Sequence, residues 1–127
     1  MSYLLFLDDE RHPDDVMWEK FPRDLVTFII RDFDTFVNQI MLSGMPAFVC
    51  FDHDLADQHY AAMIAEAEGR PADYGPEKTG YDCAKWLVDF CEDNKCTFPR
   101  YAVHSKNPIG KERIIAYIEN AKKHLDI

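Results

Sequence analysis

The chain has 127 residues, 47% of them hydrophobic and 13% aromatic, which fits one domain with a substantial core and is too short for two. A formal net charge of -9 excludes a fold-wide basic surface, so we expect no non-specific binding to duplex DNA. The four cysteines include no CxxC pair and suit structural thiols, and the apolar run at the N-terminus is too short for a signal peptide or a membrane span. We therefore expect a cytoplasmic protein with no membrane partner.

The first part of the chain predicts two strands and one helix. Residues 3–7 (YLLFL) form an apolar run of strand length, and residues 25–30 (LVTFII) are rich in β-branched and aromatic side chains. The charged stretch at residues 11–24 contains two prolines and allows at most a short helix. Apolar side chains at helical spacing over residues 33–41 then predict a full helix.

The rest of the chain predicts two more strands, two more helices and one long polar segment. The strands lie at residues 47–51 and 100–104, and the helices at residues 79–94 and 107–125. Residues 56–78 are polar and rich in turn formers, with one or two helical turns expected in YAAMIAEAE. Long irregular segments inside small domains usually serve function, and we expect a lid here.

Strands that alternate with helices predict an α/β domain spanning residues 1–127. The strands are continuous apolar runs without alternation, which is typical of a sheet covered on both faces. We therefore expect a three-layer α/β/α sandwich around a mainly parallel, four-stranded sheet. The common flavodoxin-like strand order for such a domain is 2-1-3-4.

The most polar residues of the chain follow three of these strands directly. The carboxyl ends of parallel strands meet at one edge of a sheet, where ligands bind at the point at which the strand order reverses. Strands 1, 3 and 4 would therefore bring these residues together. They are Asp8, Asp9 and Glu10 after strand 1, Asp52, His53 and Asp54 after strand 3, and His104, Ser105, Lys106 and Asn107 after strand 4.

Clustered carboxylates at this edge predict a metal site. They repel one another and raise one another's pKa, and a hard divalent cation relieves that repulsion. We expect Asp8, Asp9, Asp52 and Asp54 to be the ligands. Oxygen ligands favour Mg²⁺ or Mn²⁺, and the nearby imidazoles leave Zn²⁺ as a lower-ranked alternative.

The remaining polar residues suit phosphoryl chemistry. His53 and His104 are candidates for the general acid and base, and Ser105 would hold a phosphate oxygen. The backbone amides at the start of the helix after Ser105 offer an anion site. The predicted catalytic residues are Asp52, His53, His104 and Ser105, and the predicted substrate-binding residues are Asp82, Lys106 and Asn107.

Several candidates also have a purely structural interpretation. Asp8 and Asp9 fit a turn after their strand. Thr79 and Asp82 have the spacing of a capping box, and Asn107 before a proline is a good N-cap. These alternatives are open in the sequence alone.

Four motifs in the chain together resemble the cyclic-phosphate processing receiver family, a divergent branch of the receiver fold. The motifs are LFLDDER.P, FDHDL, TGYD..KWL and VHSKNPIG, and the similarity runs from about residue 4 to residue 115. The resemblance implies an acidic metal pocket at Asp8, Asp9 and Asp52, with His53, Asp54, His104 and Ser105 added. It also implies action on cyclic phosphate ends of nucleotides or RNA.

The chain departs from an ordinary receiver in two ways that bear on function. It has four predicted strands where a receiver has five, and the lysine that follows the fifth strand is missing. Lys78 or Lys106 would have to supply that cation. The segment at residues 56–78 is also longer than the usual receiver connection.

The sequence favours a metal-dependent phosphoesterase that acts on a cyclic phosphate, with a phosphorylated small molecule, a nucleotide or an RNA end as its partner. One alternative is a signalling module phosphorylated at Asp52. A second is a Toprim-like metal nuclease, which would use Glu10, Asp52 and Asp54. A third is a nucleotide-binding protein without catalysis.

Overall fold

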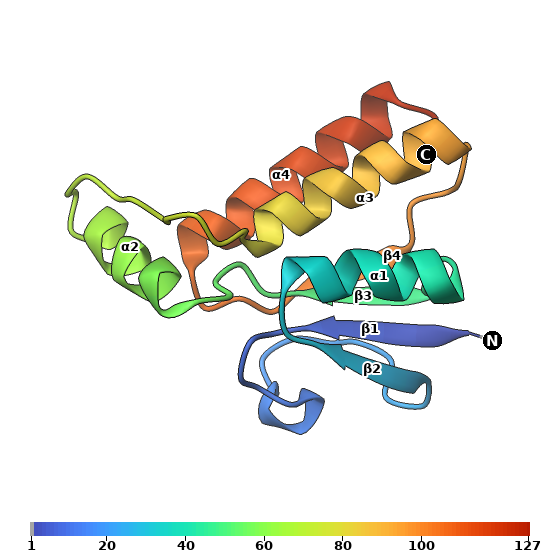
Figure 1. Cartoon of the computed structure of the whole chain (residues 1–127), viewed down its shortest axis with the longest axis horizontal. Coiled ribbons are helices and arrows are strands. Elements are labelled where there is room, and N and C mark those ends of the chain that lie inside the picture. The colour runs from blue at the N-terminus through green and yellow to red at the C-terminus, as the bar shows by residue number, and fades with distance from the viewer. Residues whose placement is uncertain (1) are drawn as a thin grey trace.

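Four strands form one parallel sheet in the structure, a computed structural model that describes residues 2–127 (Figure 1). The strands are β1 (Tyr3–Leu7), β2 (Val26–Ile30), β3 (Phe48–Phe51) and β4 (Arg100–Val103). Their order is β2-β1-β3-β4, and every neighbouring pair is parallel. The predicted α/β class, the four strands and the strand order 2-1-3-4 are confirmed.

Four α-helices and one 3₁₀ turn connect the strands. They are η1 (Pro13–Asp15), α1 (Phe33–Ser43), α2 (Asp57–Ala67), α3 (Gly80–Asn94) and α4 (Pro108–His124). The side chains of Asp32, Thr79 and Asn107 cap α1, α3 and α4, each accepting a hydrogen bond from the backbone N–H three residues on. Within residues 2–127, no helix combines the length and apolar character needed to cross a bilayer.

The two faces of the sheet are covered in different ways. Alternate side chains of β1, such as Leu5 and Leu7, enter a large core with residues of α1, α3 and α4, while Leu4 and Phe6 enter a smaller one with residues 16–29. The chain moves from β1 to β2 in one direction across the sheet, and from β2 to β3 and β4 in the other direction. Because all these crossovers are right-handed, the β1–β2 connection lies on the face of the sheet opposite to α1, α3 and α4. The predicted three layers are present, but the second covering layer consists of η1 and extended chain instead of α-helices (Figure 1).

The segment at residues 56–78 contains more helix than the sequence indicated. The prediction of one or two turns is corrected by α2, which has eleven residues. Its buried side chains, His59, Ala62 and Ala65, are mostly small and give little apolar periodicity. Figure 1 shows α2 beyond the carboxyl ends of the strands, away from the other helices. Motion of this segment as a lid stays a prediction.

His59 joins the two ends of this segment. The imidazole is fully buried, its Nδ1 accepts a hydrogen bond from the backbone N–H of Leu55 at 2.8 Å, and its Nε2 donates to the carbonyl of Glu77 at 2.8 Å. Both ring nitrogens are therefore used within the protein, which suits the neutral tautomer with its proton on Nε2. His59 has a structural role in this arrangement.

Candidate functional site

Three polar residues that end neighbouring strands meet at the carboxyl edge of the sheet. Asp8, Asp52 and His104 each follow directly on the last residue of β1, β3 and β4. The backbone ladder continues into them, since the N–H of Asp52 donates to the carbonyl of Leu7 and that of His104 to the carbonyl of Phe51. One ligand atom from each of the three residues lies within 4.8 Å of the other two. We call these residues the edge triad.

Asp8 is the ionised member of the edge triad. Its Oδ1 accepts hydrogen bonds from the backbone N–H groups of Glu10 and Arg11, at 3.0 and 2.8 Å, and its Oδ2 contacts His104 Nε2 at 3.0 Å. Burial alone would raise the pKa of this carboxyl group, but the hydrogen bonds from His104, Arg11 and Glu10 outweigh burial and lower it to about 2.

Asp52 is the member of the edge triad with the fewest hydrogen bonds. The side chain is 2% exposed, and its Oδ1 accepts only the N–H of His53 at 2.9 Å, while its Oδ2 has no hydrogen-bond partner. Burial, followed by repulsion from Asp8, raises its pKa to about 8, although Arg11 and Ser105 oppose the shift. A buried carboxylate oxygen without a partner is costly, and a bound cation would remove that cost.

His104 is fixed by contacts on several sides. Its ring stacks on Phe6 with 4.7 Å between centroids, and its carbonyl accepts a hydrogen bond from Trp18 Nε1 at 2.7 Å. The bond from Nε2 to the ionised Asp8 favours the tautomer with its proton on Nε2. Nδ1 then carries a lone pair, and this buried nitrogen has no partner. Asp52 Oδ2 and His104 Nδ1 are the two buried side-chain N or O atoms without a hydrogen bond in residues 2–127.

The other two predicted metal ligands, Asp9 and Asp54, lie outside the edge triad. Asp9 Oδ1 accepts a hydrogen bond from the Tyr60 hydroxyl at 2.6 Å, and burial is the largest cause of its raised pKa. Asp54 is buried and its Oδ1 contacts His53 Nδ1 at 2.9 Å and Asn107 Nδ2 at 3.3 Å. The geometry therefore groups Asp8 and Asp52 with the imidazole of His104, and a metal-ligand role for Asp9 and Asp54 stays a prediction.

His53 is held beneath the first turn of α4. A Cβ atom at Gly110 would lie 2.4 Å from His53 Cγ, so only glycine allows the helix to come this close. At Gly80, the first residue of α3, a Cβ would lie 1.6 Å from the carbonyl oxygen of Asp52, and the Gly80 N–H donates to the His53 carbonyl at 2.7 Å. Two helix starts thus press directly on the turn that carries Asp52 and His53.

A pocket of about 240 Å³ opens beside the edge triad. Its lining consists of Arg11, Asp52, Asp54, Tyr60, Met63, Ser105, Lys106 and Asn107. Five of these were predicted from the sequence as site residues. His53 is absent from the lining, and its imidazole instead backs Asp54 through their hydrogen bond.

Asp82 lies at the start of α3, outside the edge triad. Its carboxylate accepts the backbone N–H of Thr79 at 2.8 Å in a capping box and lies 3.5 Å from Lys85 Nζ. It does not line the pocket beside the edge triad. The capping interpretation of Thr79 and Asp82 is confirmed, and we leave Asp82 out of the proposed site.

Arg11 and Tyr60 were missed as site residues. Arg11 NH1 lies 3.3 Å from Asp8 Oδ2 and 3.7 Å from Asp52 Oδ2. The motif LDDER, in which Arg11 follows the acids at the end of the first strand, is the signal that could have found it. Tyr60 comes from α2, and no sequence signal directed its hydroxyl toward Asp9.

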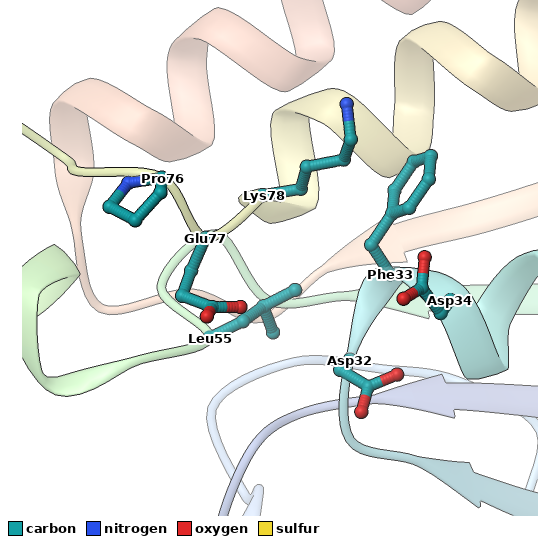
Figure 2. Close-up of a pocket in the computed structure, with 7 residues that line it drawn as sticks. All are labelled: Asp32, Phe33, Asp34, Leu55, Pro76, Glu77 and Lys78. Carbon is teal, nitrogen blue, oxygen red and sulfur yellow. The ribbon is translucent and has the colours of Figure 1, made fainter.

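A second hollow lies beside the start of α1 (Figure 2). Its lining consists of Asp32, Phe33, Asp34, Leu55, Pro76, Glu77 and Lys78. The Lys78 ammonium lies 4.9 Å from the centroid of the Phe33 ring. Of the two lysines considered as a receiver-type cation, Lys106 therefore shares a pocket with Asp52, and Lys78 belongs to this other hollow.

The edge triad fits a divalent cation. The ligand atoms are close enough to share one ion, and one of the residues, Asp52, presents a buried oxygen without a hydrogen bond. Carboxylate oxygens suit Mg²⁺ and Mn²⁺, and an imidazole nitrogen shifts the preference toward Mn²⁺ or Zn²⁺.

Comparisons with known proteins assign the family. The sequence profile of the cyclic-phosphate processing receiver domain matches residues 3–120. No curated protein matches the chain, and no solved structure does. The matched range includes all four strands, the edge triad and the lining of the adjacent pocket. The chain therefore belongs to the cyclic-phosphate processing receiver family.

Proposed function

We propose that this protein is a metal-dependent phosphoesterase that opens the cyclic phosphate of a nucleotide or an RNA end. One observation carries the proposal: Asp52 Oδ2, buried and without a hydrogen bond, belongs to a group of three potential ligands beside a pocket. Buried polar atoms in proteins are almost always paired, and an exception within such a group points to a ligand.

Asp8, Asp52 and His104 would hold the metal ion. An ion bound there supplies Lewis-acid polarisation of a phosphoryl oxygen and neutralises charge that develops on it. Arg11 and Lys106 add positive charge to the pocket lining, where they would bind the non-bridging oxygens of the phosphate. The Ser105 hydroxyl, also in the lining, is placed to donate to the same group.

Ring opening needs one proton acceptor and one proton donor. Water adds to phosphorus as the bond from phosphorus to a ribose oxygen breaks, and that oxygen takes up a proton from solvent. Asp54 lines the pocket and is our candidate to accept the proton of the attacking water. His53 donates to Asp54 from behind and would position this carboxylate, which modifies the direct acid or base role expected for His53.

The test is a panel of 2′,3′-cyclic and 3′,5′-cyclic nucleotides and RNA with cyclic phosphate ends, each with Mg²⁺, Mn²⁺ or Zn²⁺. We expect the natural chain to hydrolyse a cyclic phosphate. The variants Asp52→Asn and His104→Ala should lose this activity, and excess metal should not restore it. Asp93→Asn, an exposed acid near the end of α3, is the matched control and should retain activity. Turnover that survives both site variants would refute the residue assignment.

The same preparation separates the alternatives. Formation of an aspartyl phosphate at Asp52 with a small phosphodonor, without hydrolysis of any cyclic phosphate, would establish a receiver-type module. Cleavage of plain DNA would indicate a Toprim-like nuclease. Stoichiometric nucleotide binding without turnover would indicate a binding protein.

A further inference from the structure

Arg11 makes an unusual contact with the edge triad. A single atom of its guanidinium, NH1, faces both carboxylates, at 3.3 Å from Asp8 Oδ2 and 3.7 Å from Asp52 Oδ2. The contact with Asp52 is too long to be a hydrogen bond, which is why Asp52 Oδ2 has no partner. Arginine binds carboxylates most strongly through two parallel hydrogen bonds, and neither carboxylate receives such a pair here.

The Arg11 side chain also has a second set of contacts, toward the pocket mouth. Its Cζ lies 5.4 Å from the centroid of the Trp18 ring, and the Lys106 ammonium lies 4.1 Å from the same centroid. Arg11 is 22% exposed and lines the pocket, whereas its main chain is fixed by its N–H bond to Asp8 and by Arg31, which donates to its carbonyl at 2.8 Å. The backbone of Arg11 is thus fixed at two points, whereas the head group has a single hydrogen bond within residues 2–127, to Asp8 Oδ2 at 3.3 Å.

A guanidinium and a divalent cation are competing counter-charges for one carboxylate pair. Asp8 and Asp52 are the only acids of the edge triad, and Arg11 is the cation that the described residues place against both. Any cation bound by these two carboxylates is repelled by a guanidinium within 4 Å of the same oxygens. Because the pairing of Arg11 is geometrically poor, a better ligand for the pair displaces it at little cost.

We propose that Arg11 is an exchangeable counter-ion of the Asp8–Asp52 pair, which a divalent cation displaces toward the Trp18 side of the pocket, where the guanidinium binds the phosphate of the substrate. The proposal rests on the metal site of the proposed function. It assigns Arg11 as a positioning residue that opposes metal binding and supports phosphate binding. A residue that only stabilised the loop would do neither.

The test is calorimetric titration of Mn²⁺ into the full chain and its Arg11→Met variant. We expect Arg11→Met to bind Mn²⁺ about fivefold more tightly or better, because an exposed ion pair alone accounts for about this factor and this one is partly buried. Lys106→Met is the matched control, since it removes a cation from the same pocket and the same ring but touches neither carboxylate. Its Mn²⁺ affinity should change by less than twofold.

The second arm of the test uses inorganic phosphate at saturating Mn²⁺. We expect Arg11→Met to weaken phosphate binding by about fivefold or more, so that the two affinities move in opposite directions. Arg11→Lys keeps the positive charge on a different head group. Its affinities for Mn²⁺ and for phosphate should both lie between those of the natural chain and Arg11→Met. This variant and a Mn²⁺-dependent melting shift keep the test decisive if Arg11→Met folds poorly.

Failure of this inference is distinguishable from failure of the proposed function. If Asp52→Asn weakens Mn²⁺ binding while Arg11→Met leaves it unchanged or weaker, the metal site stands and the role of Arg11 as a competing counter-ion is refuted. If Asp52→Asn leaves Mn²⁺ binding unchanged, the metal site itself is refuted, and the inference falls with it.

Discussion

Asp52→Asn is expected to stabilise the protein at high pH while it removes the proposed function. The pKa of Asp52 is about 8 in the fold, against 3.8 for an unperturbed aspartate. A carboxyl group with a raised pKa destabilises the fold as pH rises from its unfolded value to its folded value. At pH 9, without metal, this difference corresponds to a penalty on the order of 5 kcal/mol, which asparagine would not carry. Loss of the attraction to Arg11 makes this an upper bound.

The assay is urea unfolding of the natural chain and Asp52→Asn at pH 4.5, 7 and 9 with a chelator present. We expect similar stability at pH 4.5, which lies just above the unfolded pKa, an advantage for asparagine that is largely developed by pH 7, and a smaller further gain by pH 9. Saturating Mn²⁺ should cancel the advantage by stabilising the natural chain alone. An advantage that does not change with pH, or lower stability of Asp52→Asn at pH 9, would refute the assignment of Asp52 as a buried carboxylate without adequate partners.

The remaining predictions concern Asp8 and two structural positions. Asp8→Asn should destabilise the protein by about 2 kcal/mol at pH 7, the reverse of Asp52→Asn, because the pKa of Asp8 is lowered to about 2; urea unfolding should show this loss fading as pH falls through 3.8 toward 2. Gly80→Ala should cost at least about 3 kcal/mol in the same assay, since its Cβ would lie 1.6 Å from the Asp52 carbonyl oxygen, and wild-type stability would disprove the close approach. His59→Leu should cost about 1–3 kcal/mol by leaving the N–H of Leu55 and the carbonyl of Glu77 unpaired, and faster amide exchange in α2 with α3 unaffected would locate the loss.

The sheet was predictable because its strands carry local signals. Each is a continuous apolar run followed by charged or turn residues, and the helices α1, α3 and α4 begin at recognisable caps. The length of α2 was not predictable in this way. Alanines make up much of its buried face, and His59 in its first turn bonds both to Leu55, just before the helix, and to Glu77, well beyond its end. Such contacts leave no trace in apolar periodicity.

The position of the edge triad was predictable in part from the topology of the sheet. Strand order 2-1-3-4 brings the ends of β1, β3 and β4 together, which places Asp8, Asp52 and His104 at one level. Asp9 follows Asp8 directly, and because successive residues of an extended chain point to opposite sides, its carboxylate meets Tyr60 of α2. Each member of the edge triad is the first residue after its strand, and this position separates the triad from the neighbouring polar residues.

The direction of long side chains accounts for what the sequence missed. Arg11 reaches back from a loop to Asp8 and Asp52, and Tyr60 reaches across from α2 to Asp9. Neither contact follows from spacing, because each depends on how an irregular segment folds over the end of the sheet. Contacts of this kind become visible only when the connections are placed in space.

The glycines that open α3 and α4 leave no cushioning side chain between these helices and the residues that carry the proposed chemistry. Gly80 touches the main chain of Asp52, and Gly110 touches the imidazole of His53. A shift of either helix therefore moves the turn that carries Asp52 and His53. Residues far out along the α3–α4 seam, which no inspection of the pocket would select, thus belong to the set that tunes its geometry.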